Sequence, residues 1–231
     1  MRPFKLGKPV TVTCDDVQSS DTVFTGKILR TSGTQPVYVI GFSAPQPTMI
    51  GRVLAVLTGV PQGEIWVVAP QDMVLYEWQI RRALVPVLPE KSGIYRCFYE
   101  KSCGAVLFTG DSKTRRFLIV QNRSGHNGFP KGHVEADETE IETALREIAE
   151  ETGIRATLLP EFRHSYTYSP NHFSKKEGVY FLGRFENQTL HTQTGEIFGA
   201  WLLPYEEALA ALAHEQDRIL LTLAAAAAPT C

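Results

Sequence analysis

The chain has 231 residues, 43% of them hydrophobic and 21% charged, with a formal net charge of −2 at pH 7. This composition is typical of one large or two small globular domains, and it disfavours an extended nucleic-acid surface, because phosphate binding needs clustered Lys and Arg. We expect no signal peptide and no membrane span, since no apolar run approaches the ~18 residues that a span requires. A cytoplasmic protein with reduced thiols is therefore expected. Its four cysteines have no metal-binding spacing: Cys14, Cys97, Cys103 and Cys231.

The first ninety residues are predicted to form a small, mostly-β, barrel-like domain. Short runs rich in β-branched and apolar residues predict strands, and the frequent Gly and Pro residues between them predict turns. A helix is expected over residues 73–84, followed by a Pro- and Gly-containing linker. The predicted strands cover residues 10–13, 37–40, 53–57 and 65–68.

This half resembles the barrel of small inorganic-pyrophosphatase-like proteins, on residues 7–13, 38–41, 51–56 and 65–70. In that family, the strand before the Tyr-x-x-Gly segment carries metal-binding aspartates. Here the matching segment, residues 33–37, has no acid. The resemblance thus implies a domain over 1–90 that has lost its metal site and is noncatalytic. It would pack on the second domain, form a homodimer or contribute a wall to the substrate cleft. An unrelated β domain is the alternative.

Residues 94–231 are predicted to form a second, α/β domain. The near-continuous apolar runs 103–108 and 116–120, separated by a polar turn, are typical of buried central strands. Further strands are expected at 156–164 and 178–182. The segment from Pro204 onward predicts helices, because acids and a proline are favoured in a first helical turn.

The segment from Asp137 to Gly153 predicts one amphipathic helix. Asp137 or Thr139 can cap it, with Glu140 or Glu142 as the reciprocal partner three residues later. Gly153 can end the helix in a left-handed conformation. Apolar residues at helical spacing predict the buried stripe, which comprises Ile141, Leu145 and Ile148.

Three acids of this helix, Glu147, Glu150 and Glu151, are expected on a face turned away from that stripe. Like charges at this spacing cost a few tenths of a kcal/mol each, on the order of 0.2–0.5. A hard divalent cation such as Mg²⁺ reverses the balance, because it prefers oxygen ligands and bridges to phosphate. The alternative interpretation is a solvated acidic face.

The whole stretch resembles the Nudix box, a signature of hydrolases of nucleoside diphosphates linked to another moiety. The match covers nine specified positions: Gly132, Glu138, Arg146, Glu147, Ile148, Glu150, Glu151, Gly153 and Ile154. The resemblance implies an α/β/α sandwich around a mixed sheet. It implies Mg²⁺, with Mn²⁺ as the alternative, held by Glu147, Glu150, Glu151 and the Gly132 carbonyl. Arg146 and Glu138 would orient that catalytic cluster.

The residues before the box, Pro130 to His133, resemble the Pro-Lys-Gly-His of asymmetric diadenosine tetraphosphate hydrolases. The resemblance implies that Lys131 and His133 face the phosphate chain, and both side chains can donate hydrogen bonds to phosphate oxygens. Asn127 departs from the pattern, since that family commonly has Trp there. A surface lysine is the alternative for Lys131.

Residues 165–177 are expected to form an aromatic and basic loop. Tyr166 and Tyr168 point the same way if the segment is extended, and nucleobases stack on such rings for ~1–3 kcal/mol each. The alternative is that they cover the sheet edge. Lys176 matches a lysine that, in the resembled hydrolases, contacts the polyphosphate. Glu196 resembles a further acid that Nudix enzymes place before a strand Trp, although its spacing to Trp201 is one residue short. It could be a ligand, the base that activates water or a solvated carboxylate.

We therefore predict a two-domain, Mg²⁺-dependent Nudix hydrolase in which water attacks a phosphorus of a dinucleoside polyphosphate. Diadenosine tetraphosphate, cut to ATP and AMP, is the favoured substrate. Alternatives within the family are ADP-ribose, a damaged nucleotide, a diphosphoinositol phosphate and a capped RNA end. An alternative from another class is a nucleotide-sensing module with little turnover.

Overall fold

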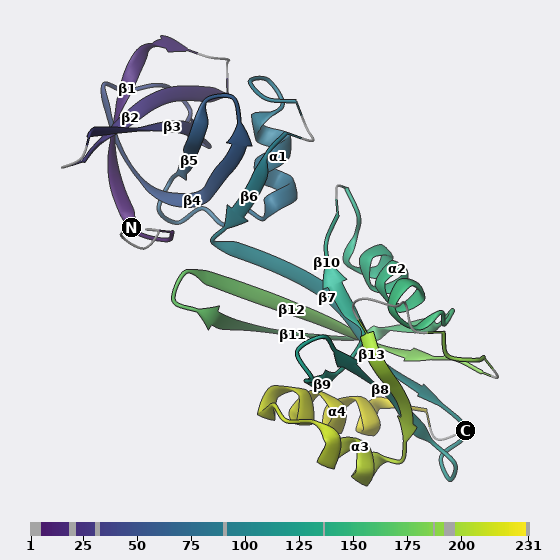
Figure 1. The fold of residues 1–231 in the computed structure, drawn as a ribbon. Helices are drawn as coiled ribbons and strands as arrows, with labels where there is room; N and C mark the ends of the chain where they lie inside the picture. The colour runs from purple at the N-terminus through teal and green to yellow at the C-terminus, as the bar shows by residue number, and fades with distance from the viewer. Residues whose placement is uncertain are drawn as a thin grey trace. The chain divides into compact units, whose positions relative to one another are not determined.

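The structure is a computed structural model that describes residues 6–18, 22–30, 33–89, 92–135, 137–186, 188–191 and 197–229. The chain divides into two compact units (Figure 1). The first contains Met1–Glu100 and Thr167–Lys176, and the second contains Lys101–Tyr166 and Glu177–Cys231.

The first unit is built on a sheet in the order β1-β2-β3-β5-β4-β6. Because β1 also pairs with the start of β4, strands β1 to β5 close on themselves, which leaves few unpaired edges. All described pairings are antiparallel except that of β3 with β5. The strands are β1 (Pro9–Gln18), β2 (Val23–Arg30), β3 (Gly33–Ile40), β4 (Thr48–Val60), β5 (Gly63–Ala69) and β6 (Ile94–Cys97).

Successive side chains along these strands point to opposite faces of the sheet, and each face packs into its own apolar core. In β5, Trp66 and Val68 enter one apolar cluster, whereas Ile65 and Val67 enter another that also contains Ile80 of helix α1 (Glu77–Leu84). The helix is shorter than predicted and begins at Glu77 rather than at residue 73. The reason lies in its cap, since the Gln79 side chain accepts a hydrogen bond from the Tyr76 backbone N–H at 3.0 Å.

In the segment that lacks the pyrophosphatase-like acid, Gln35 is buried and donates a hydrogen bond to the Glu64 carbonyl at 2.9 Å. An amide fixed to the backbone is unsuited to hold a divalent cation, which prefers anionic oxygens. The wider resemblance of this unit to that family stays a prediction.

The second unit contains a sheet in the order β11-β12-β7-β8-β13, with β10 paired to β7 and β9 paired to β8. Side chains on the two faces of this sheet belong to two different apolar clusters. Val106 and Phe117 lie in the cluster that also contains Leu220 of α4, whereas Leu107 and Leu118 lie in the cluster that contains Ile148 of α2. Helices therefore cover both faces of the sheet. This arrangement confirms the predicted α/β/α sandwich, preceded by a mostly-β, barrel-like part.

The elements of this half are β7 (Tyr99–Thr109), β8 (Arg116–Asn122), β9 (Asn127–Gly128), β10 (Lys131–His133), α2 (Glu140–Thr152), β11 (Thr157–Asn171), β12 (Ser174–Arg184), β13 (Ile197–Leu203), α3 (Tyr205–Ala211) and α4 (Glu215–Ala227). The prediction of a loop over residues 165–177 was wrong. Strands β11 and β12 continue through it as a hairpin, whose turn is held by the Asn171 side chain accepting the Phe173 N–H at 2.7 Å.

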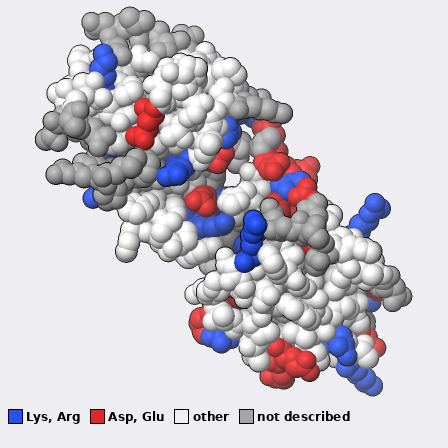
Figure 2. Space-filling view, viewed as in Figure 1, with Lys and Arg blue, Asp and Glu red and all other residues white. Residues whose placement is uncertain are grey.

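On the face shown in Figure 2, Lys and Arg side chains are interspersed with Asp and Glu side chains. Among the described residues, no helix has the length and apolar character needed to cross a membrane. Cys97 and Cys103 are buried, and burial raises the pKa of each thiol, that of Cys103 to about 12.

Candidate active site

Helix α2 begins at a capping box. The Thr139 hydroxyl accepts the Glu142 N–H at 3.2 Å, and the Glu142 carboxylate accepts the Thr139 N–H at 2.8 Å. Gly153 ends the helix with φ of 71°, a conformation that costs glycine little. Of the two predicted capping pairs, Thr139 with Glu142 is therefore the one that forms.

The predicted buried stripe of α2 was wrong in part. Ile148 is fully buried, but Ile141 and Leu145 are 40% and 38% exposed. The helix instead turns Ala144, Ile148 and the acids Glu147 and Glu151 inward, and each acid is only 8% exposed. Ala144 and Ile148 pack in one core cluster with sheet residues such as Leu107.

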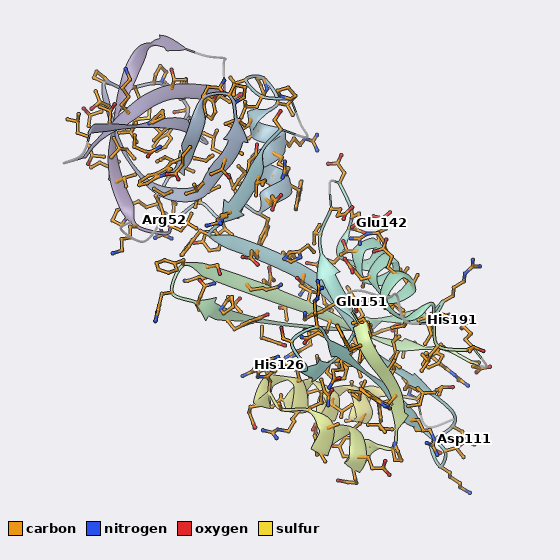
Figure 3. The ribbon with its side chains drawn as sticks, viewed as in Figure 1. Arg52, Asp111, His126, Glu142, Glu151 and His191 are labelled. Atoms are coloured by element: carbon orange, nitrogen blue, oxygen red, sulfur yellow. The ribbon has the colours of Figure 1, made fainter. Side chains whose placement is uncertain are left out.

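The loop around β10 lies directly against these two acids. A Cβ at position 132 would lie 2.0 Å from the Glu147 carboxylate, so only glycine permits this approach without a shift of that side chain. The Lys131 backbone N–H donates to Glu151 Oε2 at 3.1 Å. Figure 3 marks Glu151 at the C-terminal end of α2. The structure thus brings Gly132, Lys131, Glu147 and Glu151 together.

Arg146 links the remaining predicted acids. Its Nε donates to Glu138 Oε1 at 2.6 Å, and its Nη1 donates to Glu147 Oε1 at 2.8 Å and to Glu150 Oε2 at 3.0 Å. Its Nη2 donates to the His133 carbonyl at 2.9 Å. The hydrogen bond from Arg146 lowers the pKa of Glu138 to about 2, and the same carboxylates raise the pKa of the Arg146 guanidinium. One cation therefore fixes the loop and the helix to each other.

A second charge network, which sequence reasoning missed, holds the start of α2. Glu140 accepts from Lys101 of β7 at 2.5 Å and from Arg163 of β11 at 2.6 Å. Lys101 also lies 3.6 Å from Glu177 of β12. Hydrogen bonds from Arg163 and Lys101 lower the pKa of Glu140 to about 2. The sequence gives no signal for this network beyond the charges, because its members are far apart along the chain.

The donor set fits a hard divalent cation. Glu147 and Glu151 supply anionic oxygens beside the Gly132 backbone, and Mg²⁺ is bound in proteins through one or two carboxylates together with water and phosphate. Glu150 lies at the rim, with its side chain 48% exposed. Across the part of the chain that the structure describes, no group of three His, Cys, Asp or Glu side chains is arranged to hold a metal by itself.

The other predicted site residues lie in different settings. His133 is exposed at the end of β10, and Tyr166 is half-buried in the core beneath α4. Tyr168 and Lys176 belong to the hairpin segment Thr167–Lys176 of the first unit, so their role toward the acids stays a prediction. Glu196 lies outside the described residues.

Asp217, a buried acid in the first turn of α4, was not predicted from the sequence as a candidate site residue. Acids at a helix start are common, since they complement the helix dipole, so the sequence did not distinguish this one.

The fold and the site define the class of this protein: an α/β/α-sandwich domain whose acid-bearing helix packs against a glycine loop. The sequence matches the NUDIX domain family over residues 99–223, more than half of the chain, so the chain belongs to this family and is a Nudix hydrolase.

The comparisons also identify relatives of known activity. The chain is 33% identical over 107 residues to the asymmetrical bis(5'-nucleosyl)-tetraphosphatase of Mus musculus, covering 42% of this chain and 72% of that protein. It is 40% identical over 79 residues to the same enzyme of Rattus norvegicus, covering 29% of this chain and 54% of that protein. Among solved structures, a C. elegans Ap4A hydrolase binary complex is 24% identical, with a TM-score of 0.49 over 53% of this chain and 93% of that one.

Proposed function

We propose that this chain hydrolyses dinucleoside polyphosphates with a divalent metal ion, and that diadenosine tetraphosphate, cut to ATP and AMP, is its preferred substrate. The observation that carries the proposal is the approach of Glu147 and Glu151 to the backbone of Lys131 and Gly132. The similarity to the mouse and rat tetraphosphatases supports the choice of substrate.

Different residues of the site are proposed to bind the metal ion, bind the polyphosphate and position the loop. Glu147 and Glu151, with Glu150 at the rim, would hold Mg²⁺, with Mn²⁺ as the alternative. The bound ion would neutralise charge on the phosphate oxygens. Lys131 and His133 would donate to the polyphosphate. Arg146 and Glu138 keep the loop and the helix in register.

Hydrolysis requires that a water oxygen forms a bond to phosphorus while a phosphoanhydride P–O bond breaks. The proton lost by the water passes to a carboxylate of the site, and the leaving oxygen departs on the ATP or the AMP product. Glu196 is our candidate for that carboxylate or for a further metal ligand. Lys176 and Tyr168 are proposed to contact the substrate from the β11–β12 hairpin.

We also propose a noncatalytic role for the first domain, residues 1–90, with the hydrolase domain over 94–231. The Gln35 amide at the place of the missing acid supports this assignment. Homodimerisation through the first domain is the partner role that we favour.

The test is product analysis with Mg²⁺ on diadenosine tetraphosphate, ADP-ribose, a diphosphoinositol phosphate and a set of nucleoside triphosphates. We expect ATP and AMP from the first compound. Glu147→Gln and Glu151→Gln should each lower kcat by at least about 100-fold, because the amide cannot hold a divalent cation as the carboxylate does. Glu142→Gln is the matched control, since Gln preserves the capping box on the same helix.

The other outcomes separate the alternatives. Turnover of another compound alone would keep the chemistry and overturn the substrate. Tight nucleotide binding with no turnover of any compound would contradict the proposed hydrolysis and favour a nucleotide-sensing function.

A further inference from the structure

Asp217 is a buried carboxylate that the proposed chemistry does not use. It lies in the first turn of α4 and is 8% exposed. Its Oδ1 accepts a hydrogen bond from the Tyr166 hydroxyl at 3.0 Å. The Tyr166 ring stacks on the Tyr180 ring, with centroids 5.7 Å apart and planes 13° apart, so the donor is held in place by packing. One oxygen of Asp217 is thus satisfied by the core.

The second oxygen, Oδ2, has no hydrogen-bond donor among the residues that the structure describes. It faces the backbone of Gly128, where a Cβ would lie 3.9 Å away. His214 and Lys131 act on the carboxylate only through their charges. Burial raises the pKa of Asp217, and Tyr166, His214 and Lys131 offset only part of that rise. Oδ2 is not among the fully buried side-chain atoms that lack a partner, so this oxygen stays accessible to a hydrogen-bond donor of a bound ligand.

This oxygen lies beside the loop that carries the proposed phosphate site. The loop runs from Gly128, next to Asp217, to Gly132, next to Glu147. Four residues of extended chain span at most about 14 Å. The acids approach this loop from α2, whereas Asp217 approaches it from α4. A nucleoside attached to phosphates at Gly132 can therefore extend toward Asp217.

One pair of exposed rings near the start of α4 suits a planar ligand. The His126 ring, marked in Figure 3, stacks on that of His214 of the α4 N-cap, with centroids 5.5 Å apart. Nucleobases are commonly recognised by rings of this kind together with a polar group that reads the base edge.

We propose that Asp217 is a specificity-determining residue whose Oδ2 accepts a hydrogen bond from the exocyclic amino group of a bound nucleobase. The proposal rests on the dinucleotide hydrolysis proposed above. A carboxylate is an acceptor only, so it favours a base with an amino group at this position and disfavours one with a carbonyl oxygen there. Anchoring of α4 by Tyr166 uses one oxygen and leaves this second acceptor available to a ligand.

The test compares diadenosine tetraphosphate with its diinosine analogue, in which a carbonyl oxygen replaces the amino group. The wild-type protein should favour the adenine compound in kcat/KM by about tenfold or more, because the carboxylate oxygen is otherwise left facing a carbonyl oxygen. In Asp217→Asn, Tyr166 can still donate to the amide oxygen while the amide nitrogen donates to the inosine carbonyl. The preference should then fall at least about tenfold or invert.

The ratio of the two kcat/KM values is unaffected by the fraction of protein that is folded. A partly unfolded variant therefore still gives a valid measure of the preference between the two compounds. Glu215→Gln, an exposed acid on the same helix turn, is the matched control and should keep the wild-type ratio. Equal use of both compounds by the wild-type protein, or an unchanged ratio in Asp217→Asn, would overturn the role of Asp217 and leave the hydrolase intact. Failure of the wild-type protein on both compounds would instead overturn the proposed function.

Discussion

Arg146 is the residue on which the geometry of the site depends most. It reaches Glu138, Glu147 and the His133 carbonyl with separate nitrogens of one planar group. Residues that orient metal ligands in this way typically contribute about 10–100-fold to activity. We therefore expect Arg146→Ala to lower kcat/KM for the substrate by that amount and to reduce the free energy of unfolding by about 1–3 kcal/mol.

The conservative variant Arg146→Lys separates geometry from charge. A lysine restores the charge but not the planar fork, so it should recover stability more than activity. Steady-state kinetics and urea unfolding on the two variants provide the measurement. Wild-type kcat/KM in the lysine variant would contradict the positioning role.

At the same scale, the sequence predicted the box residues but not their surroundings. The resemblance to the Nudix box was enough to predict Gly132 and Glu147 in one site, because the residues that carry it lie within one short stretch of the chain. Asp217 escaped prediction because its neighbours Gly128 and Tyr166 are distant in sequence, and only the folded sheet brings them near α4.

At the scale of elements, helix α2 shows why apolar periodicity can mislead. Ile141 and Leu145 have the spacing of a buried stripe, yet the sheet packs against Ala144 and Ile148. The acids Glu147 and Glu151 are tolerated on the inner face because Arg146 and the Lys131 N–H offset their charge. Function therefore overrides the pattern that hydrophobic burial alone would produce.

A pair of substitutions tests this orientation of α2. Ile148→Ala should lower the free energy of unfolding by about 2–5 kcal/mol, because it leaves a cavity in the core. Leu145→Ala removes a side chain of similar size from a position that is 38% exposed and should cost within about 1 kcal/mol. Denaturant unfolding compares them directly. An equal loss in the free energy of unfolding for both variants would show that Leu145 is buried, as the apolar spacing of α2 predicts.

The network that holds the start of α2 predicts a pH dependence. The folded-state pKa of Glu140 is lowered to about 2 by Arg163 and Lys101, below the ordinary value of 4.5. Its contribution to stability is thus fully present above pH 4.5 and is lost as the pH falls toward 2, because the unfolded chain binds the proton first.

The variant Glu140→Gln lacks this contribution, so its free energy of unfolding should vary less steeply with pH between 4.5 and 2 than that of the wild-type protein. Urea midpoints across that range provide the measurement, with Glu207→Gln on α3 as a control for the loss of one acid elsewhere. Parallel curves for wild type and Glu140→Gln would contradict a stabilising role for the network.

At the scale of the whole molecule, the sequence predicted two parts but not how the chain is shared between them. The segment Thr167–Lys176 belongs to the first unit although strands β11 and β12 belong to the sheet of the second. Its Lys175 N–H donates to the Phe98 carbonyl at 2.7 Å. A contact across so many residues leaves no mark in local composition, which is why the sequence alone predicts a loop there.

The two units contain separate apolar cores, and this predicts two thermal transitions. Leu57 lies in a core of the first unit and Ile148 in a core of the second, and no described core cluster contains both. Cooperative unfolding follows a shared core, so each unit should melt as its own step. Leu57→Ala should lower one transition by on the order of 10 °C and leave the other in place, while Ile148→Ala should do the reverse. Differential scanning calorimetry of the full chain measures both steps. A single transition that both variants lower equally would show that the units unfold together, and the hairpin shared between them would then be the first place to look for the coupling.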